Sequence, residues 1–278
     1  MRIPNLWRLL KETFKGWRRA GATQISAALA YYAVFSIAPL LVIITFFVGL
    51  IHKGDTLEQV RAQFKDFVSP EAADLIARGV VNAALAGGSG FGYTAIAIVM
   101  LLVGASAFTH ALQSAVDAMW DLKPQSGKRR HVLRRGWTLL FGVGMGVFLQ
   151  ISVVVNSQAA AYRQHINALL PGFQPVWQWV DNGISFLVIA VIYGLSYKLL
   201  PSAKVAWTEA AAGAIVSTLL FSAGRWVVAL YVFQGSFTSV YGAAGSLMVV
   251  LVWLYYSSLV FLFGARFTRE TQGEFEGR

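Results

Sequence analysis

Six apolar stretches, each about long enough to cross a lipid bilayer, make up most of this 278-residue chain. An α-helix needs roughly 20 mostly apolar residues to cross about 30 Å of hydrocarbon. The last two stretches are interrupted by Arg225 and ended by Arg266, so a water-soluble fold would leave too much apolar surface uncovered. The predicted spans cover residues 24–51, 92–116, 136–157, 180–200, 208–233 and 240–267.

The composition agrees with a membrane protein. Hydrophobic residues make up 56% of the chain and charged residues 13%, whereas soluble domains carry roughly 25% charged residues. Six helices joined by short loops leave no room for a second soluble domain. The sequence therefore predicts an all-α, polytopic membrane protein that forms a single domain over residues 1–278.

Basic residues alternate between the loops, and this alternation predicts the orientation. Seventeen Lys and Arg residues fall on the side of the N-terminus, the second and fourth loops and the C-terminal tail, and five fall on the other side. Because Lys and Arg are retained in the cytoplasm, both termini are expected to be cytoplasmic. The net charge of +10 is then explained by topology, with anionic lipid as the expected partner at the cytoplasmic face. Nucleic acid is not expected, although RNA binding by the cluster at residues 128–135 stays an alternative.

Two segments outside the spans also show helical periodicity. Residues 5–19 place Leu6, Leu10, Phe14 and Trp17 at helical spacing with basic residues largely opposite, which is typical of a helix in the cytoplasmic interface. A plain anchor and orientation signal is the alternative. In the first outer loop, apolar residues recur at helical spacing between residues 57 and 86, which predicts a small helical periplasmic cap.

Arg225 lies about seventeen residues into the fifth span. A charged side chain at the centre of a bilayer costs about 2.5–3.5 kcal/mol, so it usually faces the interior of the bundle or a wet cavity. The hypothesis is that Arg225 faces an internal polar site, where it pairs with Asp181 or hydrogen-bonds Asn156. Snorkelling of the side chain toward the outer headgroups is the alternative.

Polar residues also form a stripe along the second span. The stripe consists of Ser106, His110, Gln113, Ser114 and Asp117. A spacing of three or four residues puts them on one helical face, which indicates either a cavity-lining route or hydrogen bonds between packed helices. For His110, a proton relay and a satisfied packing residue are both open. By contrast, the small residues Ala210, Gly213, Ala214 and Ser217 in the fifth span need only close helix packing as their explanation.

No catalytic constellation is evident. The four histidines are scattered over both sides and the membrane, and no HExxH or GxSxG motif occurs. The absence of cysteine excludes disulfides and thiolate zinc sites. The sequence therefore predicts no catalytic site, no metal site, no cofactor and no enzyme.

Four stretches, taken in order along the chain, resemble the YihY/BrkB family of bacterial inner-membrane proteins. They are residues 27–42 (AALAYYAVFSIAPLLV), 101–120 (LLVGASAFTHALQSAVDAMW), 200–231 (LPSAKVAWTEAAAGAIVSTLLFSAGRWVVALY) and 241–268 (YGAAGSLMVVLVWLYYSSLVFLFGARFT). The resemblance implies six transmembrane helices in the inner membrane and no established molecular activity. Members long carried a ribonuclease label, and some are linked to serum resistance or envelope physiology. Where the family often has Gly-Ala-Glu at the end of the last span, this chain has Gly264, Ala265 and Arg266.

These features together predict an inner-membrane protein that transports or translocates an envelope lipid or another amphiphilic anion. A non-transporting scaffold for envelope assembly is the second interpretation, and a ribonuclease is the third. Homo-oligomerisation, substrate and coupling ion are left open.

Overall fold

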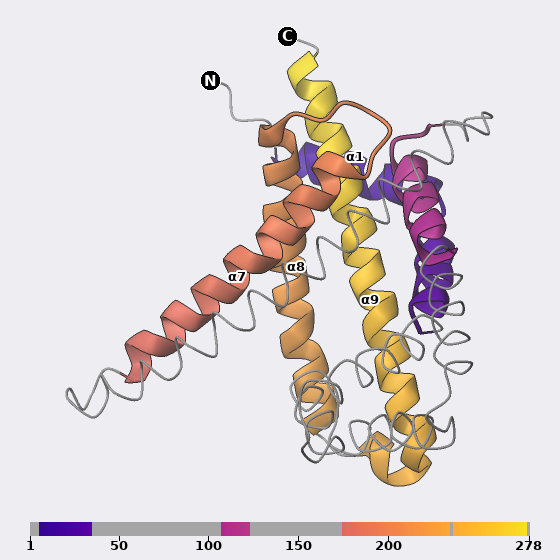
Figure 1. The fold of residues 1–278 in the computed structure, drawn as a ribbon, viewed down its shortest axis with the longest axis vertical. Helices are drawn as coiled ribbons and strands as arrows, with labels where there is room; N and C mark the ends of the chain where they lie inside the picture. The colour runs from indigo at the N-terminus through magenta and orange to yellow at the C-terminus, as the bar shows by residue number, and fades with distance from the viewer. Residues whose placement is uncertain (1–5, 35–106, 123–173, 234–235, 277–278) are drawn as a thin grey trace, which may run out of the picture. The chain divides into compact units, whose positions relative to one another are not determined.

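The computed structural model describes residues 6–34, 107–122, 174–233 and 236–276, and every regular element in these ranges is an α-helix (Figure 1). The labelled helices are α1 (Leu6–Arg19), α7 (Gln174–Leu199), α8 (Trp207–Phe233) and α9 (Ser236–Glu276). Two further helical segments cover residues 22–34 and 107–119. For the described part of the chain, the all-α prediction is confirmed.

The predicted spans agree with these helices where the two can be compared. α8 begins one residue before the predicted fifth span and ends with it. α7 begins at residue 174 rather than 180, and α9 continues to residue 276 rather than 267. The segments 22–34 and 107–119 overlap the first and second spans. The third span and the predicted periplasmic cap lie outside the described residues.

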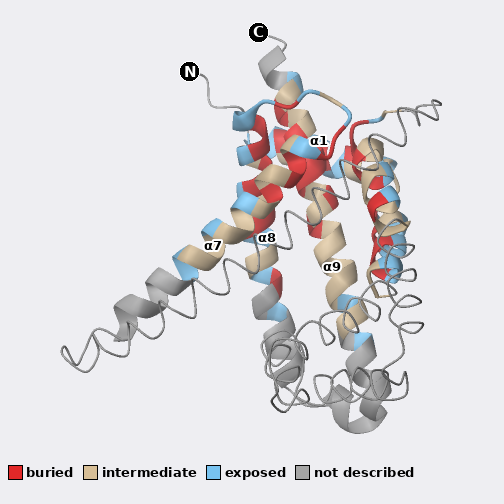
Figure 2. Cartoon of the chain, viewed as in Figure 1, coloured by how far each residue is buried: buried red, intermediate tan, exposed pale blue. Residues whose placement is uncertain are grey.

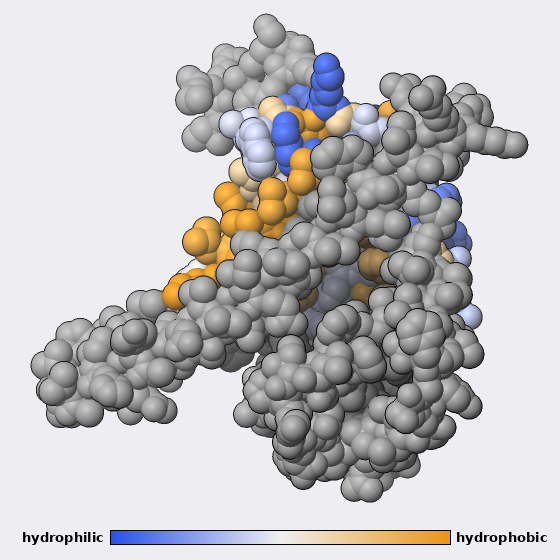
Figure 3. Space-filling view, in the orientation of Figure 1, coloured by the Kyte–Doolittle hydropathy of each residue, from blue (hydrophilic) through white to orange (hydrophobic). Residues whose placement is uncertain are grey.

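Two described helical stretches are long and apolar enough to cross a membrane, Asn182–Leu199 on α7 and Val250–Gly273 on α9. Large apolar side chains on these helices and on α8 are exposed, including Leu187, Leu219 and Val252. Figure 3 shows a run of hydrophobic residues along the described part of α7. Exposed apolar surface on this scale is expected where a helix contacts lipid rather than water.

The chain divides into two compact units, each built from separate parts of the sequence. The first unit consists of Met1–Ala22, Gln113–Ala223 and Val260–Arg278, and the second of Thr23–Leu112 and Gly224–Leu259. In the first unit, Met119, Tyr197 and Leu262 are fully buried and mark its core (Figure 2). The single-domain prediction stays a prediction.

Two helices of the first unit end at residues with left-handed backbone. α1 stops where Gly21 adopts a φ of 69° and its N–H donates to the carbonyl of Arg18. The helix over residues 107–119 ends at Asp121, which has a φ of 51°. There Leu122 N–H bonds the Asp117 carbonyl at 3.0 Å and Asp121 N–H bonds the Ala118 carbonyl at 3.1 Å. This is a Schellman C-cap with aspartate in the position that glycine usually takes.

The connection between α7 and α8 follows from its local sequence. α7 ends at Leu199 because Pro201 disfavours helical backbone at the residue before it. α8 begins with a capping interaction, in which the Ala206 N–H donates to Glu209 Oε2 at 2.9 Å. A carboxylate in the first turn also interacts favourably with the helix dipole.

α9 is longer than a membrane span. Its 41 residues extend about 60 Å at 1.5 Å per residue, about twice the thickness of the hydrocarbon layer. The last part of α9, from Arg266 to Glu276, is rich in polar and charged residues. We therefore expect this end to extend beyond the hydrocarbon, where it packs within the first unit.

Candidate functional site

The residues predicted to form an internal polar site are only partly visible. Arg225 lies on α8 and Asp181 on α7, and their side chains are outside what the structure describes. Asn156 and Ser106 lie outside the described residues altogether. The pairing of Arg225 with Asp181 or Asn156 therefore stays a prediction.

His110, Gln113 and Asp117 all lie on the helix over residues 107–119, as the stripe predicts. His110 is exposed, and Gln113 and Asp117 are half-buried. Asp117 has a defined structural contact, because its Oδ1 accepts hydrogen bonds from Ser202 N–H at 3.1 Å and from Ser202 Oγ at 2.9 Å. This carboxylate therefore ties the helix to the connection between α7 and α8.

The backbone near Arg225 lies at a close helix approach in the second unit. A Cβ added to Gly224 would overlap the ring of Tyr256 on α9. Only glycine at position 224 lets α8 approach the tyrosine this closely. Arg225 is the next residue on α8, so the charge is attached directly beside a packed helix contact.

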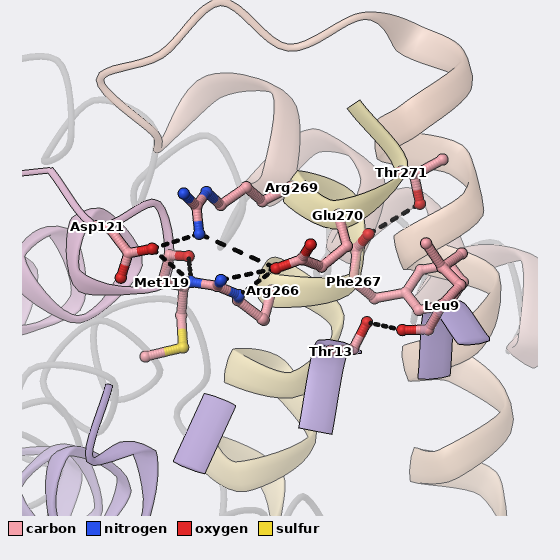
Figure 4. Close-up of polar contacts among 9 residues, drawn as sticks. All are labelled: Leu9, Thr13, Met119, Asp121, Arg266, Phe267, Arg269, Glu270 and Thr271. Atoms are coloured by element: carbon pink, nitrogen blue, oxygen red, sulfur yellow. Dashed lines mark hydrogen bonds and ion pairs between the residues drawn. The ribbon is translucent and has the colours of Figure 1, made fainter. Parts of the chain in front are cut away.

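Among the described residues, the most extensive polar arrangement surrounds Arg266 on α9, a residue for which sequence reasoning predicted no site role. Its guanidinium lies between two carboxylates in Figure 4. Nη1 lies 3.0 Å from Asp121 Oδ2, and Nη2 lies 2.6 Å from Glu270 Oε1. Arg269 also pairs with Asp121. We call Asp121, Arg266, Arg269 and Glu270 the arginine cluster.

Arg266 also binds backbone. Its Nη1 donates to the carbonyl of Met119 at 2.9 Å, one of the last carbonyls of the helix over residues 107–119, which have no partner within the helix. A cation at this end of a helix interacts favourably with the helix dipole. The side chain of Arg266 is only 7% exposed, so its ion pairs and this carbonyl contact together compensate for the loss of water.

Electrostatics at Asp121 follow from these neighbours. Burial raises the pKa of the Asp121 carboxyl, but the hydrogen bond and charge of Arg266 and the charge and hydrogen bond of Arg269 outweigh it. The pKa of Asp121 therefore lies below its ordinary value. The two cations and two carboxylates balance, so the cluster holds helices together without a net charge to attract an ion.

α1 is seated against this cluster at Gly16. A Cβ added to Gly16 would overlap the guanidinium of Arg266, so α1 and α9 approach closely at this point. One turn earlier, Thr13 is buried and its Oγ1 donates to the Leu9 carbonyl at 2.8 Å (Figure 4). Next to Gly16, the indole of Trp17 packs edge-on to Phe263 with 6.4 Å between ring centroids.

A second contact joins α7, α8 and α9. Tyr197 is fully buried, and its hydroxyl lies 2.7 Å from Ser217 Oγ and donates to the Phe261 carbonyl at 2.9 Å. A Cβ on Gly264 would overlap Ser217 Oγ and lie 2.5 Å from Tyr197 OH. The small strip of α8 (Ala210, Gly213, Ala214 and Ser217) is buried, which confirms the prediction that it serves close packing.

Part of the arginine cluster had a signal in the sequence. Arg266 and Glu270 are four residues apart, the spacing at which opposite charges pair on a helix. Asp121 had none, because 145 residues separate it from Arg266 and nothing local to either residue indicates the other.

Comparison with known proteins gives a consistent family. Residues 13–278 match the family described as "Virulence factor BrkB". A "UPF0761 membrane protein" of Halorhodospira halophila is 28% identical over 88% of this chain and 53% of its own length. Proteins with the same description from Mannheimia succiniciproducens and Alkalilimnicola ehrlichii are 26% and 27% identical, over 88% and 91% of this chain and 83% and 56% of their own lengths. The chain thus spans little more than half the length of two of these relatives. No solved structure matches the chain.

Proposed function

This chain belongs to the BrkB family, whose relatives are named as UPF0761 membrane proteins, and on that premise we propose that it moves an amphiphilic anion across the bacterial inner membrane. An envelope lipid is the class of substrate we favour. Such a molecule carries an anionic headgroup and apolar chains. A cation within the membrane would attract the headgroup, and lipid-facing helices would contact the apolar chains.

The observation that supports this proposal is the position of Arg225. It is the nineteenth residue of the 27-residue helix α8, eight residues before its end, and it follows a glycine that packs against α9. An arginine inside a span costs several kcal/mol unless it finds a polar partner or water. An anionic headgroup would be such a polar partner for the Arg225 side chain.

The proposed topology places both termini in the cytoplasm. The segments predicted to share that side make contacts within the first unit. Arg266 of α9 contacts α1 at Gly16 and pairs with Asp121 beyond the second span. Gln272 of α9 donates to the carbonyl of Lys204 in the fourth loop at 2.9 Å. Segments that contact one another directly must lie on the same side of a membrane, which supports the charge-based orientation.

A scaffold without transport is the second candidate, and the tight packing within the first unit favours it. Tyr197, Ser217 and Gly264 form a close helix crossing, and the arginine cluster ties further helices together. Rigid junctions of this kind suit a protein that holds partners in place. In either case we propose that the chain is not an enzyme, since the sequence carries no motif for hydrolysis.

Reconstitution separates the candidates. The full chain is placed in liposomes with a fluorescent anionic phospholipid, and transbilayer movement is followed by chemical quenching from outside. We expect the wild type to move the lipid and Arg225→Ala to be slower by roughly 10-fold or more, the effect of losing a charged hydrogen bond. Arg225→Lys keeps the charge and should retain part of the activity, and the loop variant Lys204→Gln is a control that should match the wild type.

If wild-type protein did not move the fluorescent lipid across the bilayer, transport would be contradicted and the scaffold would be the favoured function. Equal rates for wild type and Arg225→Ala would remove Arg225 from the mechanism. A nuclease assay on the same preparation tests the third alternative, because activity that is lost on a point substitution would make the chain an enzyme.

A further inference from the structure

α1 has three distinct faces, and one of them is a narrow strip that is buried against the protein. Leu9, Thr13 and Gly16 are buried, with spacings of four and three residues that place them on one side of the helix. Thr13 satisfies its own hydroxyl by bonding the Leu9 carbonyl. The helix is therefore attached through a narrow strip, and Leu6, Trp7 and Phe14 lie outside it.

The second face carries large apolar side chains, and the part of it that lies away from α9 is exposed. Trp7 is 79% exposed, Leu6 59% and Phe14 51%. Phe14 stacks on Trp17 at 5.8 Å between ring centroids, and Trp17 contacts Phe263 of α9. The aromatic surface is thus continuous from α9 to the outer edge of α1. Contact of this surface with water would be unfavourable. Exposed patches of large apolar residues usually mark a site that contacts a protein or a membrane.

The third face carries the charge. It consists of the exposed residues Arg8, Lys11, Lys15, Arg18 and Arg19. Within residues 6–34, 107–122, 174–233 and 236–276, no carboxylate forms an ion pair with any of these five cations. Arg18 lies over the ring of Phe14 at 6.0 Å, so the basic face directly borders the aromatic one. The charges are available to an external anion.

We propose that α1 binds the surface of a bilayer that contains anionic phospholipid. Trp7 and Phe14 enter the boundary between headgroups and acyl chains, and Lys11, Lys15 and Arg18 bind headgroup phosphates. An apolar face bordered by cations is the pattern by which amphipathic helices bind anionic membranes. The Gly16 contact with Arg266 holds α1 at a fixed rotation, so both faces meet the bilayer together. This inference does not depend on transport.

The absence of cysteine allows a direct test of the rotation. Single cysteines are introduced as Trp7→Cys and as Glu12→Cys, which lies on the side of the helix away from Trp7, and each is spin-labelled in the full chain. In nanodiscs containing phosphatidylglycerol, the label at position 7 is expected to be reached by dissolved oxygen and the label at position 12 by a water-soluble nickel complex. Equal access of the nickel complex to both positions would overturn the proposal.

A second measurement tests the charge. Binding of a fluorescent phosphatidylglycerol is measured in detergent for the wild type and for the triple variant Lys11→Gln, Lys15→Gln, Arg18→Gln. Because each basic residue near an anionic surface contributes about 1 kcal/mol, or roughly fivefold, the triple variant should bind at least 10-fold more weakly. Lys15→Gln alone should bind roughly fivefold more weakly, and the matched variant Lys204→Gln should bind as the wild type does.

Two results would contradict a lipid-binding role for α1. One is unchanged binding of the fluorescent lipid by the triple variant. The other is tight binding of single-stranded RNA that displaces the lipid and is lost in the same variant, which would make α1 a nucleic-acid surface. Because α1 keeps its buried strip in every variant, circular dichroism should show unchanged helix content.

Discussion

At the scale of single residues, Arg266 has more defined partners than any other charge in the described part of the chain. It binds two carboxylates and a helix-terminal carbonyl from a nearly buried position. From the sequence alone, a charged residue at position 266 indicates only that the sixth span ends there. Its partners show instead that it connects α9 to the end of the helix over residues 107–119.

Replacing Arg266 by methionine should therefore destabilise the protein. Breaking a fully buried ion pair costs about 3–5 kcal/mol, and because Asp121 is about half exposed we expect roughly 1–3 kcal/mol in unfolding experiments. Arg266→Lys should lose part of this, since lysine cannot reach Met119, Asp121 and Glu270 together. Arg269→Gln, which removes a more exposed pair, should cost less than about 1 kcal/mol. An equal effect of the two arginine substitutions would contradict the central position of Arg266.

Asp121 predicts a pH dependence. Its pKa in the folded protein lies below its ordinary value, which is about 3.9 in an unfolded chain. The ionised carboxylate thus contributes stability that is present above about pH 4 and is lost as the pH falls through the folded-state pKa. Melting temperatures of wild type and Asp121→Asn, measured between pH 3 and 6, should converge as the pH falls. A constant gap would exclude this contribution.

At the scale of helices, glycines decide where close contact occurs. Gly264 admits Ser217 and Tyr197 against α9, Gly213 admits Thr268 against α8, and Gly16 admits Arg266 against α1. Helices in lipid associate through such close approaches, because burial from water contributes little there. By contrast, a Cβ added to Gly183 on α7 or to Gly273 on α9 would meet nothing within 4 Å.

Gly264→Ala should disrupt the crossing of α7, α8 and α9. Overfilling a packed contact costs about 1–3 kcal/mol, which should appear as a lower melting temperature in detergent. Gly183→Ala on α7, with nothing within 4 Å of the added Cβ, is the matched control. It should be neutral or more stable by up to about 1 kcal/mol, because alanine favours helix. Equal loss in both variants would argue against a specific crossing at Gly264.

The contact between α1 and the arginine cluster calls for a double-mutant cycle. Gly16→Ala should push the Arg266 guanidinium from its partners and cost about 1–3 kcal/mol, whereas Gly273→Ala, which meets nothing within 4 Å, should not. In the Arg266→Met background, the flexible methionine can move aside and the Gly16 substitution should cost much less. Additive free energies of unfolding would mean that the two residues do not interact.

At the scale of the whole molecule, the contacts within the first unit join the segments whose orientation we propose. α1, the end of the helix over residues 107–119, the α7–α8 connection and the end of α9 all contribute contacts to the first unit. The excess of basic residues lies on the same segments. The proposed orientation requires these segments to lie on one side of the membrane, so their accessibility from outside the cell tests it.

Cysteine accessibility tests this orientation in cells. In the cysteine-free chain, Ser202→Cys and Gly273→Cys should be protected from a membrane-impermeant thiol reagent, whereas a cysteine in the first outer loop, such as Lys65→Cys, should react. Disruption of the cells should expose all three. Labelling of position 202 in intact cells would reverse the orientation and with it the proposed cytoplasmic face.

The sequence by itself determined that the described part of the chain is helical, and it located α7, α8, α9 and parts of the helices over residues 22–34 and 107–119. It did so because the hydrocarbon thickness requires a certain length of apolar residues, a property that can be read locally. Helix periodicity likewise predicted α1, but not that its buried strip would be Leu9, Thr13 and Gly16.

Only the tertiary structure decided which residues meet. The pairing of Arg266 with Asp121 joins positions 145 residues apart. The contact of the Arg266 guanidinium with Gly16 depends on the rotation of α1 and α9 about their own axes. The rotation of each helix cannot be predicted from hydropathy or from the charge pattern, because many rotations place the same apolar residues in lipid. Close packing selects one of them, and it does so through small residues and buried hydrogen bonds whose partners are distant in the chain.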